Sequence, residues 1–201
     1  MTALTTTRRS LHGVAELLLA GPQFTTSERI ELRVAGAGFA TIAAPALAVE
    51  GTRLITSSGA ADLPGRTYRE VAAEIGVEPR DLADVYTDGP AVRADETIEL
   101  DADAVATLLS AFVAGDRALR ALAPDETPVL WPEHFDVAIT LDAVNYGVSP
   151  GDGFLPEPYA YVGPHEPRHG EFFNAPFGAA RPVRELDDLL AFFREGRALA
   201  R

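Results

Sequence analysis

The sequence contains neither cysteine nor lysine among its 201 residues. Without cysteine the chain has no disulfide, no thiolate metal site and no cysteine nucleophile. Without lysine it has no Schiff-base chemistry and no Walker-type phosphate loop. A metal ion would need histidine, carboxylate or backbone oxygen as its ligands, and the sequence identifies no cofactor.

Basic residues are also few: 17 arginines face 30 acidic residues, which gives a formal net charge of −13. An acidic surface repels phosphate groups, so nucleic acid and anionic membrane are excluded as general partners. No apolar run approaches the roughly 20 residues that span a bilayer. We therefore expect a cytoplasmic protein whose partner is a small molecule, while its oligomeric state stays open.

The N-terminus carries a twin arginine, Arg8–Arg9, followed by a short apolar patch that contains Glu16. This patch is too short for an export signal, and no small-residue cleavage site follows it. Its apolar residues recur at helical spacing, which predicts a docked amphipathic helix with His12 at the edge of the core or on the surface. Residues 21–28, which begin with Gly-Pro, are predicted to form a loop.

The order of the remaining elements predicts an α+β fold. Alternating apolar residues predict strands at 29–36, 39–45, 46–57 (a hairpin about Glu50–Gly51), 97–100, 134–142, 157–163 and 171–175. Helical periodicity and capping residues predict helices at 67–76, 79–86, 103–122 and 183–200. Hydrophobic residues make up 47% and charged residues 23%, as in ordinary globular proteins. We expect a single α+β domain over 1–201, in which 1–123 and 124–201 both contribute to a mainly antiparallel sheet packed against the long central helix and the terminal helices.

The stretch LWPEHFDVAITL places a histidine and an aspartate at the start of an apolar strand. Because side chains alternate along a strand, His134 and Asp136 should share one face, about 7 Å apart, and Phe135 the other. If the strand at 157–163 pairs with this one, further acidic and tyrosine side chains converge on the same patch. The Gly/Pro-rich segment 143–156 would then be a loop that covers the patch, and such long loops are often functional.

This patch is the candidate site of the sequence. His134 would be the acid/base or ligand contact, Asp136 its orienting partner and Glu157 a second carboxylate. The predicted ligand-binding residues are Trp131, Glu133, Asn145, Tyr146, Asp152, Tyr159, Tyr161 and Asn174. The function predicted in this way is binding, with or without chemical transformation, of a small polar molecule.

Three alternatives stay open beside this site. His134 and Asp136 can instead form a hydrogen-bonded pair in a structural or interaction module without chemistry. A metal site completed by His165 or His169 is a further alternative, and no metal ligand is assigned. Residues 67–86 also look like a helix-turn-helix, but their second helix is too acidic for phosphate contact. No Gly-x-Ser-x-Gly motif is present, and Ser149 is not predicted to be a nucleophile.

Three motifs in the C-terminal segment resemble those of a family of uncharacterised bacterial proteins of about this length. The motifs are Trp-Pro-x-His-Phe-Asp at 131–136, Asn-Tyr-Gly-x-Ser-Pro-Gly-Asp at 145–152 and Glu-Pro-Tyr-x-Tyr-Val at 157–162. The resemblance implies no activity, because none is assigned to that family. His165 stands where the family is expected to have an aromatic residue, which counts against a metal-binding role for His165.

Overall fold

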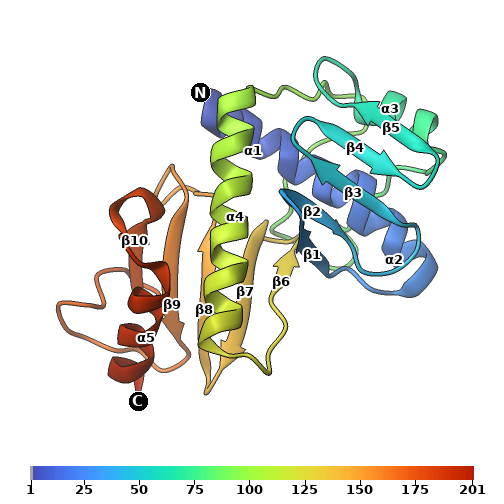
Figure 1. The fold of residues 1–201 in the computed structure, drawn as a ribbon. Coiled ribbons are helices and arrows are strands. Elements are labelled where there is room, and N and C mark those ends of the chain that lie inside the picture. The colour runs from blue at the N-terminus through green and yellow to red at the C-terminus, as the bar shows by residue number, and fades with distance from the viewer. Residues whose placement is uncertain (1) are drawn as a thin grey trace.

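All the strands of the protein belong to one antiparallel sheet, to which both halves of the chain contribute. The computed structural model describes residues 2–201. Its ten strands follow the order β10-β9-β8-β7-β6-β1-β2-β3-β4-β5. The two halves of the sheet meet where Leu32 of β1 pairs with Leu130 of β6 (Figure 1). The α+β fold with a mainly antiparallel sheet is thus confirmed.

The elements have the following bounds. The strands are β1 Leu32–Ala35, β2 Gly38–Thr41, β3 Leu47–Glu50, β4 Arg53–Thr56, β5 Gly59–Asp62, β6 Val129–Trp131, β7 Asp136–Leu141, β8 Val144–Ser149, β9 Tyr159–Pro164 and β10 Ala179–Pro182. The α-helices are α1 Ala3–Gly13, α2 Gly21–Ser27, α3 Tyr68–Ile75, α4 Ala102–Leu122 and α5 Leu189–Ala200. A π-helix, η1 Val14–Ala20, connects α1 to α2, and a 3-10 turn, η2 Val183–Glu185, precedes α5.

The long helix α4 covers one face of the sheet, with α5 beside it (Figure 1). Asp101 caps α4 by accepting a hydrogen bond from the backbone N–H of Ala104, which satisfies one of the donors at the helix start. Gly115 allows close contact with the sheet, because a methyl group placed there would lie 2.9 Å or less from the side chains of Val137 and Val148. In the C-terminal half the core therefore lies between α4 and the sheet, and the opposite face of β7–β9 is left available.

The N-terminal helix is longer than predicted, because it runs without interruption from α1 through η1 into α2. The predicted loop at 21–28 is therefore wrong. The side chain of Gln23, which is fully buried, explains the difference. Its amide donates to the carbonyls of Arg29 and Glu31 and accepts from the backbone of Ile42 and Ala43, which docks α2 against the sheet.

Several other predicted elements differ from the structure. Residues 79–86 contain no helix; they form an irregular segment in which Leu82 and Tyr86 are buried. The helix-turn-helix hypothesis therefore lacks its second helix. Residues 97–100 form only a single bridge, from Thr97 to Thr67, and the last strand is β10 rather than 171–175. The hairpin about Glu50–Gly51 and the helix at 103–122 are confirmed, apart from one residue at the start of the helix.

The most important difference concerns residues 143–156, which were predicted to be a loop. Residues 144–149 form β8, which lies between β7 and β9 and pairs with both. The strands at 134–142 and 157–163 are therefore not direct neighbours, and only residues 150–158 remain as a connecting loop.

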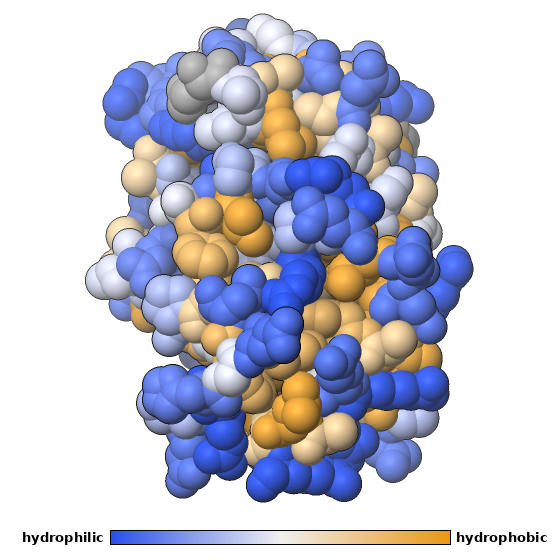
Figure 2. Space-filling view, turned by 90° about the vertical axis from the view of Figure 1, so that its left-hand side faces the viewer, coloured by the Kyte–Doolittle hydropathy of each residue, from blue (hydrophilic) through white to orange (hydrophobic). Residues whose placement is uncertain are grey.

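The surface shown in Figure 2 carries patches of hydrophobic residues separated by hydrophilic ones. In the C-terminal half, the large hydrophobic side chains that stay exposed include Phe154, Phe177 and Leu199. No helix in the described part of the chain combines the length and the apolar character that crossing a membrane requires.

Candidate functional site

A cavity of about 1040 Å³ lies over the face of β7, β8 and β9 that is turned away from α4. Side-chain alternation along the three strands sends Val137, Tyr146 and Val162 into the core. It leaves Asp136, Ser149 and Tyr161 to line the cavity. The cavity is also lined by Arg8 and His12 of α1, and by several residues at the end of β9 and in the segment between β9 and β10, among them His165, His169 and Phe177.

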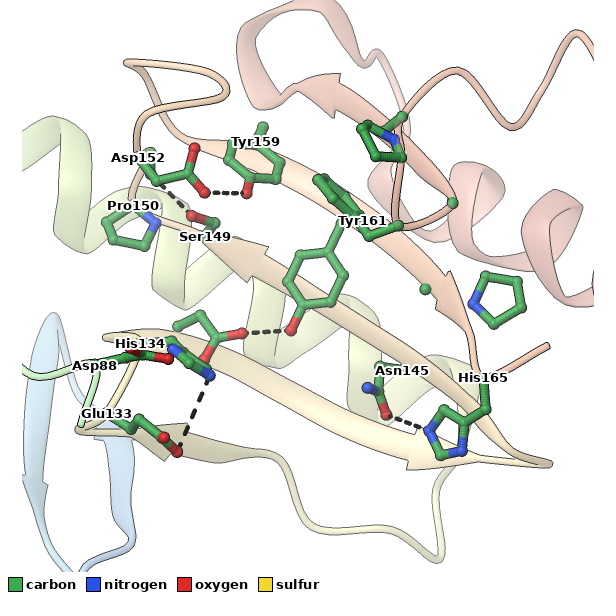
Figure 3. A pocket seen from close by; sticks show the side chains of 18 of the residues that line it. Asp88, Glu133, His134, Asn145, Ser149, Pro150, Asp152, Tyr159, Tyr161 and His165 are labelled. Atoms are coloured by element: carbon green, nitrogen blue, oxygen red, sulfur yellow. Dashed lines mark hydrogen bonds and ion pairs between the residues drawn. The ribbon is translucent and has the colours of Figure 1, made fainter. Parts of the chain in front are cut away.

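Asp136 and Tyr161 form the central contact on this face. Gly147 of β8 pairs with Ala138 on one side and with Tyr161 on the other. Because Gly147 has no side chain, the ring of Tyr161 can lie across β8, and a methyl group at position 147 would come within 2.5 Å of the ring. The hydroxyl of Tyr161 thereby reaches β7 and donates a hydrogen bond to Oδ2 of Asp136 (Figure 3).

Asp136 is the most deeply buried acidic group of the cavity, with 7% of its surface exposed. Burial raises the pKa of this carboxyl, and the hydrogen bond from Tyr161 together with the nearby His134 counteracts part of the rise. The second oxygen, Oδ1, is buried and has no hydrogen-bond partner among the described residues. The carboxyl group therefore has an unused polar atom in a poorly solvated position.

His12 of α1 joins the site although its sequence position gave no sign of it. Its Nε2 atom lies 2.6 Å from the carbonyl oxygen of Pro132, so this nitrogen donates the hydrogen bond. The imidazole stacks on the ring of Phe135 at a centroid distance of 5.3 Å. Burial lowers the pKa of His12 to about 4, so the ring is neutral at pH 7 and its Nδ1 atom is an acceptor.

Arg8, one helical turn before His12, lines the other part of the cavity beside the loop 150–158. Its Nη1 atom donates a long hydrogen bond of 3.4 Å to the carbonyl oxygen of Pro156. Within residues 2–201 it forms no ion pair, although the charge of Asp152 acts on it. Burial lowers the pKa of Arg8, and the negative charge of Asp152 opposes that effect.

Both oxygen atoms of the Asp152 carboxylate already accept hydrogen bonds, from its own loop and from the start of β9. Its Oδ1 atom accepts hydrogen bonds from the backbone N–H groups of Phe154 and Leu155, at 2.7 and 3.1 Å. Its Oδ2 atom accepts from the hydroxyl of Tyr159 at 2.6 Å (Figure 3). Burial and this contact raise the pKa of Tyr159, which keeps its hydroxyl protonated as a donor.

The structure brings together seven of the residues predicted from sequence. They line the cavity: Glu133, His134, Asp136, Asn145, Asp152, Tyr159 and Tyr161. The relation of His134 to Asp136 differs from the prediction, because the strand begins only at Asp136 and His134 lies in the preceding turn. Phe135 in that turn has a positive φ of 53°. His134 is exposed, and its Nε2 atom lies 4.0 Å from Oε2 of Glu133.

Four predicted site residues do not line this cavity. Tyr146 points to the opposite face of β8 and is fully buried in the core. Glu157 forms an ion pair with Arg184 at 2.5 Å, outside the cavity. Trp131 lies on β6 with 37% of its surface exposed, and Asn174 pairs with the backbone of Ala180. The prediction placed Tyr146 incorrectly because the strand β8 was not recognised. Glu157 lies in the loop 150–158, because β9 begins only at Tyr159.

All four histidines of the chain line the cavity, namely His12, His134, His165 and His169. Within residues 2–201, however, no three histidine or acidic side chains stand close enough together to hold a metal ion. His165 instead lies 3.3 Å from Oδ1 of Asn145. Ser149, which was not predicted to act in the site, lines the cavity and accepts a hydrogen bond from the backbone of Gly151 at 3.1 Å.

Comparison of the chain with protein-family models, curated proteins and solved structures finds no match. The side chains of the cavity are therefore the basis of the functional proposal.

Proposed function

We propose that the protein binds a small polar molecule in this cavity, with Asp136 and Tyr161 as its anchor. The observation that carries the proposal is the unpartnered Oδ1 atom of Asp136. A buried polar atom without a hydrogen bond costs about 1–3 kcal/mol, and native structures contain few of them. A ligand that donates a hydrogen bond to Oδ1 would remove this cost.

The rival hypothesis is a structural or interaction module in which these residues form only a network between strands. Such a network stabilises a fold best when each of its polar atoms has a partner. Asp136 has one oxygen paired with Tyr161 and the other unpaired, at the wall of a cavity large enough for a small molecule. These features favour ligand binding.

Proton transfer to or from the bound molecule is a second candidate function. The raised pKa of Asp136 favours it, because a general acid or base works best when its pKa lies close to the working pH. Tyr161 would position the carboxyl group through Oδ2, so that Oδ1 exchanges the proton with the ligand. His12 stays neutral beside them and would not compete as an acid.

A screen of small polar compounds by thermal unfolding tests the proposal. Compounds that raise the melting temperature of the wild-type protein should raise that of the isosteric variant Asp136→Asn much less. Glu157→Gln is the matched control, because Glu157 is a carboxylate on a neighbouring segment outside the cavity. The proposal fails if no compound stabilises the wild-type protein, or if Asp136→Asn responds to every stabilising compound as the wild type does.

A further inference from the structure

Two groups of opposite charge in the cavity have binding capacity that the described residues leave unused. Oδ1 of Asp136 is buried and accepts no hydrogen bond. The half-buried guanidinium of Arg8 has no ion pair within residues 2–201 and only the 3.4 Å contact to Pro156. The two observations are independent, since one concerns strand β7 and the other helix α1.

Two other arginines of the cavity and the carboxylate of Asp152 have partners elsewhere. Arg9 forms an ion pair with Glu96 at 2.8 Å. Arg168 donates to the carbonyl oxygen of Ala200 at 3.0 Å and pairs with Glu166. Both carboxylate oxygens of Asp152 accept hydrogen bonds from its own loop and from Tyr159, as described above. Asp88, which is exposed, and Glu133, 4.0 Å from the imidazole of His134, also line the cavity. Within residues 2–201, Arg8 is therefore the arginine of the cavity without an ion pair, and Asp136 is its most deeply buried carboxyl group.

These two groups lie near the same end of strand β8. Val137 pairs with Val148, so Ser149 lies at the next position of the ladder, beside Asp136. Ser149 accepts a hydrogen bond from the backbone of Gly151. Arg8 lies against that glycine, because a methyl group at position 151 would be 2.7 Å from Nη1 of Arg8. Arg8 and Asp136 therefore line the same end of the cavity.

Aromatic side chains form another wall of the cavity. Tyr159 and Phe177 lie with ring centroids 6.4 Å apart and an interplanar angle of 30°. Phe177 is 40% exposed, and its ring centroid lies 5.3 Å from that of Phe154, which is 44% exposed, so the two rings form a small exposed apolar patch. The wall offers a ring or a short apolar group a place beside the two charged groups.

We infer that the ligand is a small amphoteric molecule of the amino-acid class, with an anionic group bound by Arg8 and an amino group bound by Oδ1 of Asp136. This inference rests on the proposed function and names the chemical class of its ligand. A carboxylate matches the fork of guanidinium donors, and an ammonium group supplies the donor and the charge that a buried carboxylate needs. The hydrocarbon part of the ligand contacts the aromatic wall.

Titration calorimetry with four related compounds tests the inference. Phenylalanine and 4-(aminomethyl)benzoate carry both charges at two different spacings, whereas benzylamine and benzoate carry one charge each. At least one of the two zwitterions should bind the wild-type protein about tenfold or more tightly than either singly charged compound, because each charge-assisted contact contributes roughly a factor of ten.

Variants of Asp136 and Arg8 then test which residue binds each charged group of the ligand. Asp136→Asn should weaken binding of the zwitterion and of benzylamine, and leave benzoate unchanged. Arg8→Gln should weaken binding of the zwitterion and of benzoate, and Arg8→Lys should retain part of that affinity. Glu157→Gln and Arg184→Gln, which remove charges of the same two kinds outside the cavity, should leave all affinities unchanged. Far-ultraviolet circular dichroism verifies that each variant is folded.

The inference and the proposed function can fail separately. If benzylamine or benzoate binds as tightly as both zwitterions, and Asp136→Asn weakens binding of that compound, the cavity is a ligand site but its ligand is not amphoteric. If none of the four compounds binds, the inference is overturned, and the broader thermal screen decides on the proposed function.

Discussion

The contact between Tyr161 and Asp136 leads to a prediction with a defined magnitude. Tyr161→Phe removes the only hydrogen bond that the carboxyl group of Asp136 accepts from another side chain within residues 2–201, and leaves the ring in place. Because Asp136 is 93% buried, water cannot replace the lost donor at full strength. We expect the free energy of unfolding to fall by about 1–3 kcal/mol, which is the cost of leaving a buried polar group unsatisfied.

A double-mutant cycle isolates this contact from other effects of losing the hydroxyl. In the background Asp136→Ala no buried carboxyl group remains, so Tyr161→Phe should cost less than about 0.5 kcal/mol there. Urea unfolding at pH 7, followed by circular dichroism, gives the four free energies of the cycle. Equal costs of Tyr161→Phe in the two backgrounds would refute the assignment of this hydrogen bond as the support of Asp136.

Three further predictions concern the neighbouring residues. His12 has a pKa of about 4 in the folded protein against 6.5 in the unfolded chain. The unfolded chain therefore gains a proton that the folded protein does not, and this lowers the unfolding free energy by up to about 3 kcal/mol as the pH falls from 6.5 to 4. Urea titrations over this range should show a smaller loss in His12→Gln, and an equal loss would contradict the neutral buried ring. Gly147→Ala places a methyl group against the ring of Tyr161, so both stability and ligand affinity should fall, the stability by about 1–3 kcal/mol. Unchanged affinity would show that the position of Tyr161 does not matter for binding. Glu157→Gln breaks an exposed ion pair with Arg184 and should change the unfolding free energy by less than about 1 kcal/mol, and a larger loss would mean that the pair is structural.

The fold class and the longest elements follow from local patterns in the sequence. The helix at 103–122 has an aspartate cap and a continuous apolar stripe, and the structure contains it as α4 with one added residue. The hairpin about Glu50–Gly51 has alternating strands on both sides of a turn glycine. Such elements are predictable because the residues that determine them are close together in the chain.

The errors arose where tertiary contacts override local signals. Gly21–Pro22 reads as the end of a helix, yet α2 continues because the side chain of Gln23 is buried against distant backbone groups. Strand β8 contains Gly147 and is followed directly by Pro150 and Gly151, so the segment reads as part of a Gly/Pro-rich loop despite its alternation of Val144, Tyr146 and Val148. The glycine that weakened the strand signal is the residue that lets Tyr161 cross to Asp136.

The candidate site was predictable in part, because side-chain alternation along a strand is a local property of the sequence. Alternation along β7 separates Asp136, which lines the cavity, from Val137 in the core, and along β9 it groups Tyr159 with Tyr161. Arg8 and His12 were not predictable, because they reach the cavity from a helix more than 100 residues away in the sequence. Only the folded chain shows that the N-terminal helix completes a site built by the C-terminal strands.

The central claim is that the cavity over β7, β8 and β9 is a ligand site anchored by Asp136. The most direct measurement is a two-dimensional ¹H–¹⁵N NMR titration of the wild-type protein with small polar and zwitterionic compounds. The account predicts that the shifted resonances concentrate at residues 134–136, 147–152 and 159–163, and that the shifts disappear in Asp136→Asn. Shifts that lie elsewhere on the molecule, or that persist unchanged in Asp136→Asn, would contradict it.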